Sequence, residues 1–223
     1  MKLTFYGHAC FLIDTGREKL LFDPFLTGNG SASIRAEDVD CDYILLTHAH
    51  GDHFGDADAI AARTGAAVVA VPEVLGLFEH APKAAWPMNL GGSLALPFGR
   101  VHMVPAFHSS GVAGGVACGF LICFADGVNV YYSGDTALFG DMTLIGRKAP
   151  IHYAVLPIGD NYTMGPADAV EAAKLLGAKR VIPIHYNTWP VIAQDPAAFA
   201  ALAEKAGVAP HVLAPGETLT LEK

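Results

Sequence analysis

Three histidines and one aspartate, His48, His50, Asp52 and His53, fall within six consecutive residues. They follow residues 43–46, whose apolar and branched side chains predict a buried strand. Side chains two positions apart in extended backbone point the same way, so His48 and His50 are expected to converge. A turn then brings Asp52 and His53 to the same space. Imidazole and carboxylate groups bind zinc, nickel, manganese or iron, so we expect a metal site rather than a solvated loop. Because thiolates would indicate a closed structural site, their absence favours an open catalytic one.

Three more residues of ligand type, His108, Asp135 and His185, stand at or just after the ends of other strand-like runs. Those runs are residues 101–106, 128–132 and 180–184. Strand ends at one edge of a layered α/β fold are where sites are commonly built, so we expect all seven side chains to meet there. Seven ligands are enough to hold two metal ions.

Apolar runs and helix signals predict the elements that must position these side chains. We expect strands at residues 3–6, 9–13, 18–23, 43–46, 67–71, 94–96, 101–106, 119–125, 128–132, 153–157, 180–184, 212–213 and 218–221. We expect helices at residues 56–63, 72–78, 167–176 and 196–206, a long loop at 24–40 and a mobile connector at 111–119. Each half opens antiparallel and then alternates strands with helices, which predicts an α/β fold built as a four-layer αββα sandwich.

Length and composition predict one large interior. A chain of 223 residues with 52% hydrophobic and 16% charged residues fits a single α/β domain over residues 1–223. The mean hydropathy of +0.35 is high, yet every long apolar stretch is interrupted before the roughly 18 residues that a membrane-spanning helix needs. We therefore expect a soluble protein with no membrane partner.

The net charge and the cysteines indicate which binding partners and which cellular compartment to expect. The net charge of -8, from 14 basic and 22 acidic residues, opposes binding to a polyphosphate backbone, so no nucleic-acid partner is expected. The N-terminus has no convincing cleavage site, which favours the cytoplasm. Cys10, Cys41, Cys118 and Cys123 form no C-x-x-C pair and are expected to be free thiols. Cys10, two residues after His8, is a further candidate ligand.

The ligand pattern H-x-H-x-D-H, followed by a distant histidine, an Asp in Ser133-Gly134-Asp135 and a last histidine, resembles that of the metallo-β-lactamase superfamily. The resemblance covers almost the whole chain. A closer resemblance is to a branch of small predicted metal-dependent hydrolases related to ascorbate-6-phosphate lactonase-like proteins. Residues 7–11 and 157–166 carry that closer resemblance.

The resemblance implies two divalent ions, zinc first among the candidate metals, with the ligands divided between them. His48, His50 and His108 would hold one ion, Asp52, His53 and His185 the other, and Asp135 would bridge them. A hydroxide shared by two ions about 3.5 to 4 Å apart would then attack a small ester, lactone or related substrate. The resemblance also assigns catalytic roles to Asp52 and His8. Asn161, Tyr162 and Asn187 follow strands near the site and are candidate substrate-binding residues.

Other functions are compatible with this pattern of metal ligands. A phosphodiesterase acting on nucleic acid or phospholipid would use the same ligands but needs a basic or apolar rim. A non-enzymatic metal-dependent sensor and a mononuclear iron persulfide oxygenase are further alternatives. Related proteins often assemble, so a homo-oligomer is among the expectations.

Overall fold

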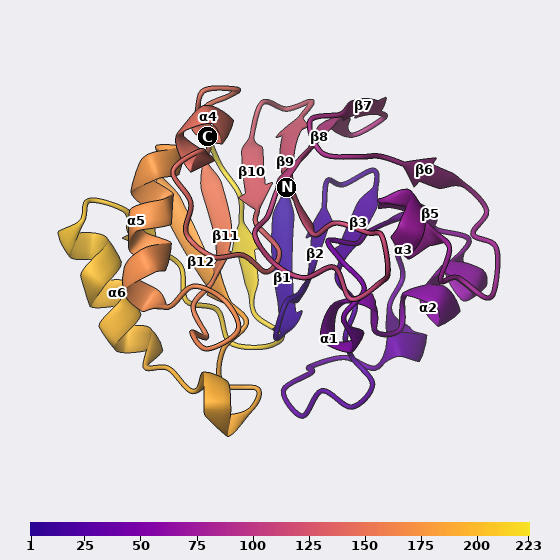
Figure 1. Cartoon of the computed structure of the whole chain (residues 1–223), viewed down its shortest axis with the longest axis horizontal. Coiled ribbons are helices and arrows are strands. Elements are labelled where there is room, and N and C mark those ends of the chain that lie inside the picture. Colours follow the sequence, from indigo (N-terminus) through magenta and orange to yellow (C-terminus); the bar gives the residue numbers. More distant parts are fainter.

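Two seven-stranded sheets pack face to face between outer layers of helices (Figure 1). The computed structural model describes all residues from 1 to 223. The order of layers is helix, sheet, sheet, helix, which confirms the predicted αββα sandwich.

The first sheet has the strand order β14-β1-β2-β3-β4-β5-β6. Its strands are β1 (Lys2–Gly7), β2 (Cys10–Asp14), β3 (Lys19–Phe22), β4 (Tyr43–Leu45), β5 (Ala67–Ala70), β6 (Ala85–Pro87) and β14 (Thr218–Thr220). Strands β14 to β3 pair antiparallel, and β3 to β6 pair parallel. Helices α1 (Gly51–Phe54), α2 (Ala57–Thr64) and α3 (Pro72–Leu75) lie on this side of the molecule.

The second sheet repeats this plan with the order β13-β12-β11-β10-β9-β8-β7. Its strands are β7 (Ser93–Leu96), β8 (Gly99–Pro105), β9 (Cys118–Phe124), β10 (Asn129–Tyr132), β11 (Tyr153–Pro157), β12 (Arg180–Ile184) and β13 (Ala209–Pro210). Helices α4 (Met142–Gly146), α5 (Pro166–Leu176) and α6 (Pro196–Lys205) cover its outer face. Asp195 caps α6 by accepting from the backbone of residues 197 and 198, as its position before a proline predicts.

Side chains that alternate along the strands form a hydrophobic core on each face of the second sheet. Tyr132 and Val155 face the first sheet, whereas Tyr131 and Ala154 face the helices, and all four are buried. The Tyr132 ring meets Phe11 edge to face, with the centroids 5.0 Å apart. Packing on both faces keeps the strand ends, and whatever follows them, in fixed positions.

Most of the predicted elements are present, and the differences lie at the sheet edges and in short helices. Strand β13 is at Ala209–Pro210 and not at residues 212–213, because it is residues 209 and 210 that pair with β12. The short elements β6, α1 and α4 were not predicted; α1 stands where a turn was expected, and the 24–40 loop contains a 3-10 helix at Ala36–Asp38. That residues 1–223 form a single domain stays a prediction.

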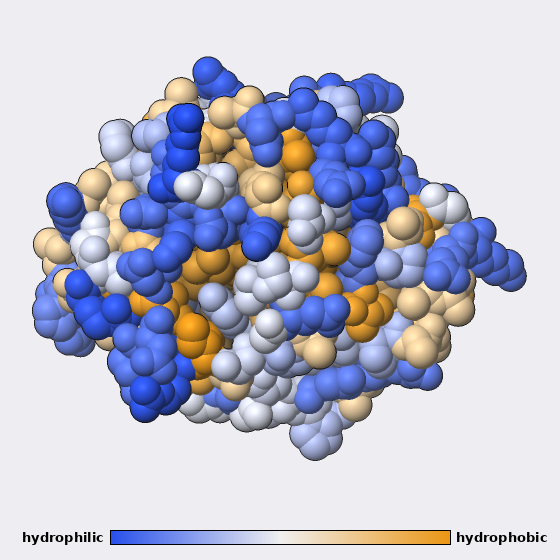
Figure 2. Space-filling model, turned by 180° about the vertical axis from the view of Figure 1, so that it is seen from behind, coloured by the Kyte–Doolittle hydropathy of each residue, from blue (hydrophilic) through white to orange (hydrophobic).

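None of the helices combines the length and the apolar character that crossing a bilayer requires. On the face seen in Figure 2, hydrophilic residues separate the patches of hydrophobic ones.

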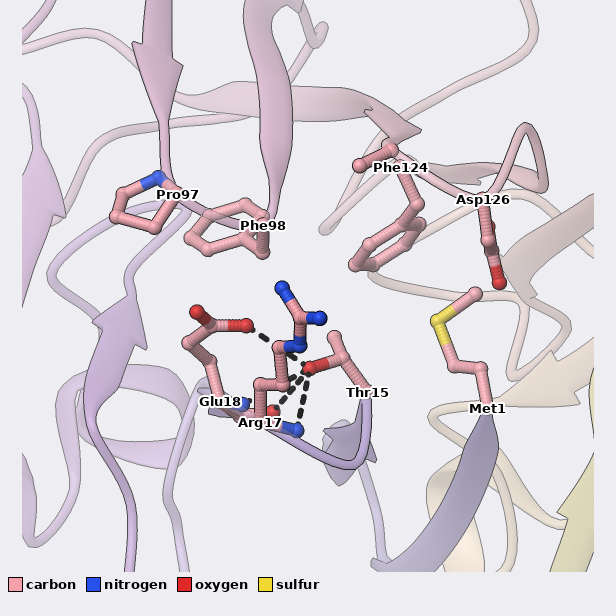
Figure 3. Close-up of a pocket in the computed structure, with 9 residues that line it drawn as sticks. Met1, Thr15, Arg17, Glu18, Pro97, Phe98, Phe124 and Asp126 are labelled. Atoms are coloured by element: carbon pink, nitrogen blue, oxygen red, sulfur yellow. Dashed lines mark hydrogen bonds between the residues drawn. The ribbon is translucent and has the colours of Figure 1, made fainter.

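The two edges of the sandwich differ in chemistry. At the edge with the β2–β3 turn, a cavity of about 290 Å³ is lined by Arg17, Glu18, Phe98 and Phe124 among others, and no histidine lines it (Figure 3). All seven predicted ligands follow strand ends at the opposite edge.

Candidate metal centre

His48, His50 and His108 form a first group of imidazoles. His48 and His50 follow β4, and His50 precedes the short helix α1, accepting a hydrogen bond from the His53 backbone N–H at 3.0 Å. The His50 Nδ1 atom lies 3.0 Å from His48 Nε2 and 3.2 Å from His108 Nε2. The convergence predicted from the i, i+2 spacing is therefore present, and His108 joins it from the end of β8.

Asp52, His53 and His185 form a second group, which also contains His8. The Asp52 Oδ2 atom lies 3.1 Å from His8 Nε2, 3.6 Å from His185 Nε2 and 3.9 Å from His53 Nε2. One carboxylate oxygen thus faces three imidazole nitrogens, which arrive from α1, from the end of β1 and from the end of β12.

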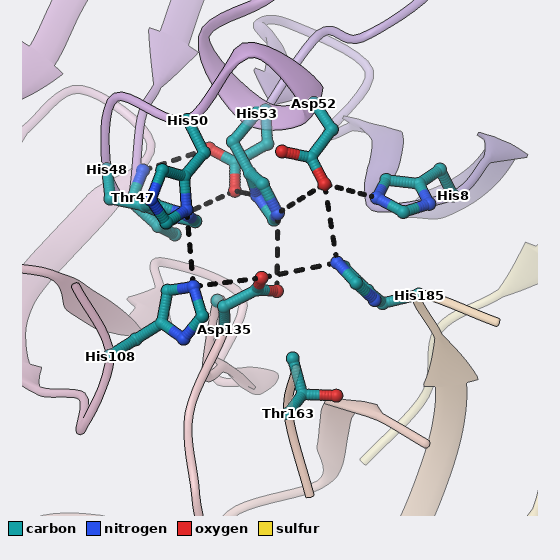
Figure 4. Close-up of polar contacts among 12 residues, drawn as sticks. His8, Thr47, His48, His50, Asp52, His53, His108, Asp135, Thr163 and His185 are labelled. Atoms are coloured by element: carbon teal, nitrogen blue, oxygen red, sulfur yellow. Dashed lines mark hydrogen bonds and ion pairs between the residues drawn. The ribbon is translucent and has the colours of Figure 1, made fainter. Parts of the chain in front are cut away.

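Asp135 lies between the two groups (Figure 4). Its Oδ1 is 3.2 Å from His53 Nε2, and its Oδ2 is 3.2 Å from His185 Nε2 and 3.5 Å from His108 Nε2. Gly134 makes this placement possible: its φ is +58°, and a Cβ there would come within 2.7 Å of the Thr47 Cβ. One carboxylate therefore contacts histidines of both groups.

The donor set fits divalent cations. His53 Nε2, His185 Nε2 and Asp135 Oδ1 are buried and form no hydrogen bond. Buried polar atoms rarely remain without a partner. Here His53 Nε2 and His185 Nε2 each face one oxygen of Asp135 at 3.2 Å. Imidazole nitrogens and carboxylate oxygens gathered in this way are the ligands that zinc and similar ions use. The ligand role of each residue stays a prediction.

Burial and the Asp135 carboxylate shift the pKa values of the histidines at the site. Burial lowers the pKa of the His48 imidazole well below its ordinary value and also lowers that of His108. Burial acts in the same direction on His185, but the Asp135 carboxylate outweighs it and raises the pKa to about 9. For Asp135 itself, burial would raise the pKa, yet His53 and His185 hold it well below the usual range. Asp135 therefore favours its ionised form and His185 its protonated form, in which the two side chains stabilise each other.

His8 is fixed from three sides. It adopts a left-handed conformation with φ +56°, its backbone oxygen accepts from the His185 N–H at 2.8 Å, and its Nδ1 lies 2.8 Å from Thr188 Oγ1. Burial lowers the pKa of the His8 imidazole to about 4. Because the Asp52 carboxylate can only accept, His8 Nε2 donates to it, and Nδ1 accepts from the Thr188 hydroxyl.

Asp23 contacts the candidate centre, and the sequence analysis did not single it out. It directly follows β3, is fully buried, and accepts hydrogen bonds from His53 Nδ1 at 2.7 Å and from the Thr47 N–H at 2.9 Å. The hydroxyls of Thr47 and Tyr132 also donate to it. It therefore orients His53 from behind, as carboxylates beside metal-binding histidines do. Its position at a strand end was the available signal.

A cavity of about 300 Å³ opens onto the two groups. Tyr162 and Trp189 line it together with Ser109 and five of the predicted ligands. Of the candidate substrate residues, only Tyr162 reaches this cavity. Asn187 lines a separate cavity, and its side chain accepts from the Gln194 N–H at 2.7 Å. Asn161 is exposed and lines neither. The substrate roles of all three stay predictions.

The other histidines and Cys10 lie outside these groups. His80 pairs with Asp58 at the surface, and His152 accepts a hydrogen bond from a backbone N–H of β10. Cys10 is fully buried in β2.

The chain is similar to known metal-dependent hydrolases. Residues 11–186 match the beta-lactamase superfamily domain. A UPF0173 metal-dependent hydrolase from Pelotomaculum thermopropionicum is 49% identical over 99% of this chain and 100% of that protein. The solved structure of Igni18, a metallo hydrolase from Ignicoccus hospitalis, is 38% identical with a TM-score of 0.92, covering 100% of this chain and 98% of that one. An isothiocyanate hydrolase from Delia radicum gut bacteria, 19% identical over 99% of both chains with a TM-score of 0.80, shares the fold.

Proposed function

Because the chain belongs to the beta-lactamase superfamily and is a metal-dependent hydrolase, we propose that it holds two divalent ions and cleaves a small ester or lactone. The observation that carries the two-ion proposal is Asp135, whose two oxygens contact histidines of both groups.

We assign His48, His50 and His108 to one ion, and Asp52, His53 and His185 to the other, with Asp135 shared. Zinc is the metal we propose, since imidazole supplies five of these seven ligands and zinc commonly takes nitrogen donors. When bound, the ions supply Lewis-acid activation of water at neutral pH and polarisation of the scissile carbonyl.

Asp52 and His8 have further tasks in this proposal. Asp52 is partly exposed to the cavity, so its carboxylate can accept a hydrogen bond from the attacking water and orient it. His8 does not line the cavity; it donates to Asp52 and is itself held by Thr188. These contacts support a positioning role for His8, in which it fixes the Asp52 carboxylate, over direct protonation of a leaving group.

The proposal is tested by removing metal with a chelator, reloading the protein with zinc and assaying a panel of neutral esters and lactones. We expect turnover that is lost on metal removal and restored on reloading. Bis(p-nitrophenyl) phosphate in the same panel tests phosphodiester cleavage. A zinc-loaded protein that hydrolyses no ester or lactone would overturn the proposal.

His8→Ala and His8→Gln separate the two roles of this residue. Because a glutamine amide can still donate to Asp52 but cannot act as an acid, a positioning role predicts that Gln retains more turnover and metal than Ala. Equal loss of turnover in both variants, with full metal content, would instead support proton transfer by His8.

We further propose that the protein acts in the cytoplasm on a small molecule. All four cysteines are free, which agrees with a reducing compartment.

A further inference from the structure

The cavity at the candidate metal centre has no Lys or Arg in its lining. Its imidazole and carboxylate side chains are the predicted ligands His50, Asp52, His108, Asp135 and His185. Lys and Arg are also absent from the first 12 to 20 residues after the strands at this edge, which are residues 23–34, 46–62, 106–117, 133–146, 158–173 and 185–204. The basic residues of these segments occur only farther along them, at Arg35, Arg63, Arg147, Lys148, Lys174, Lys179 and Lys205.

Two aromatic rings form the other part of the lining. Trp189 is 36% exposed and Tyr162 is 57% exposed, so both present apolar area to whatever enters the cavity. The Trp189 ring is held in place: its centroid lies 4.9 Å from the His8 ring and 6.1 Å from the Phe25 ring. A ring fixed in this way can pack against a ligand with little loss of conformational freedom.

Charge and apolar area together restrict the substrate. An anionic group remote from the scissile bond, and so from the proposed ions, would find no Lys or Arg in this lining to replace its hydration. An aromatic or branched apolar group would instead bury area against Trp189 and Tyr162.

On the premise of the proposed hydrolase function, we propose that the substrate is an uncharged ester or lactone with an aromatic or apolar group beside the scissile bond, selected by Trp189 and Tyr162. Water adds across the acyl C–O bond of this substrate, and the products are the carboxylic acid and the alcohol. Phosphorylated lactones and other substrates with a remote anionic group are excluded.

Three acetate esters test the selection by zinc-loaded protein. Benzyl acetate carries a neutral ring, 4-(acetoxymethyl)benzoate carries the same ring with a remote carboxylate, and methyl acetate has no ring. We expect kcat/KM for benzyl acetate to exceed each of the other two by roughly tenfold or more, the usual scale of discrimination by an apolar pocket. Equal values for the neutral and anionic benzyl esters, or for benzyl and methyl acetate, would overturn the inference while the hydrolase function stands.

Trp189→Ala should reduce the ratio of kcat/KM for benzyl acetate to that for methyl acetate, mainly through KM of the benzyl ester. Trp86→Ala is the matched control, because Trp86 on β6 is similarly exposed, at 39%, but does not line the cavity. Tyr162→Arg supplies the missing cation and should shift preference toward the anionic ester. An unchanged ratio in Trp189→Ala, or the same fall in Trp86→Ala, contradicts the role of Trp189.

Binding without turnover separates this inference from the proposed function. In a Trp86→Phe background Trp189 is the only tryptophan, and benzyl alcohol should change its fluorescence emission at lower concentration than 4-(hydroxymethyl)benzoate does. If no ester is hydrolysed, the proposed function fails, and this titration alone decides whether the cavity takes neutral aromatic ligands. Tighter binding of the anion would overturn the inference.

Discussion

Replacing Asp23 by Asn should destabilise the protein and weaken metal binding, although Asp23 is not a predicted ligand. The carboxylate is fully buried and accepts from the His53 imidazole, the Thr47 backbone and two hydroxyls. An amide has only one acceptor oxygen, and its NH₂ group would face donors. Removing one partner of a buried charged pair costs about 3–5 kcal/mol. We expect a loss of this size in the free energy of unfolding.

Urea and thermal unfolding of the metal-free protein measure this loss. For a chain of this length, about 3–5 kcal/mol corresponds to a fall in Tm of roughly 6–20 °C. The same change lets the His53 ring turn, so zinc affinity should fall about ten- to hundredfold, as for other groups that orient metal-binding histidines. Competition with a chromophoric chelator measures that affinity.

Asp58→Asn is the matched control. Asp58 and His80 form the same kind of carboxylate–imidazole pair at 2.9 Å, but on the surface, where solvent screens it. This variant should leave both stability and zinc affinity unchanged. If Asp23→Asn unfolds and binds zinc as Asp58→Asn does, Asp23 does not support His53 in the way described.

Three further predictions concern other contacts of the site. Gly134→Ala should destabilise the protein and weaken zinc binding, because the added Cβ would lie 2.7 Å from a Thr47 carbon. Gly114 is also at positive φ but has no atom within 4 Å, so Gly114→Ala should cost only the backbone strain of about 1–2 kcal/mol. Equal losses in the free energy of unfolding, measured in urea, would contradict this. Thr188→Val removes the hydroxyl that His8 Nδ1 accepts from and should lower turnover toward the His8→Ala level, with Thr188→Ser retaining it; full activity in Thr188→Val would contradict the positioning role. In metal-free protein the pKa of His185 is raised to about 9 from an ordinary 6.5, so its stabilising contribution is complete below about pH 6.5 and is lost as the pH rises through 9. Tm measured from pH 6 to 10 should fall over that window in wild type. His185→Gln should show a smaller fall, because Asp135 and Asp23 also raise the pKa of the buried His53; a fall equal to that of wild type would contradict this prediction.

The fold was largely predictable because the apolar patterns of the strands and helices coincide with boundary residues such as proline and glycine. Pro166 and Gly177 bracket α5 as predicted, with Gly177 in the left-handed conformation at φ +64°. The predictions failed at edge elements such as β6, where residues 85–87 are exposed and pair on one side only, so no buried apolar pattern indicates them. Strand β13 has two residues and forms only because β12 offers a partner edge.

The candidate site was predictable where ligand types stand at strand ends, and less so where contacts depend on loops. His108, Asp135 and His185 could be grouped with the 48–53 segment because β8, β10 and β12 end at the same edge as β4. Asp23 obeys the same rule, but as the last residue of the predicted strand 18–23 it was not counted among the residues of ligand type at strand ends. Thr188 had no signal, since its contact with His8 joins residues 180 positions apart.

The metal content of the purified protein, measured by elemental analysis, tests the central claim most directly. We predict two divalent ions per chain, at most one in His48→Ala and His185→Ala, loss of both in Asp135→Ala, and two in the surface control His80→Ala. A wild-type protein that takes up no divalent ion after zinc loading, or an Asp135→Ala variant that keeps both ions, would contradict the account.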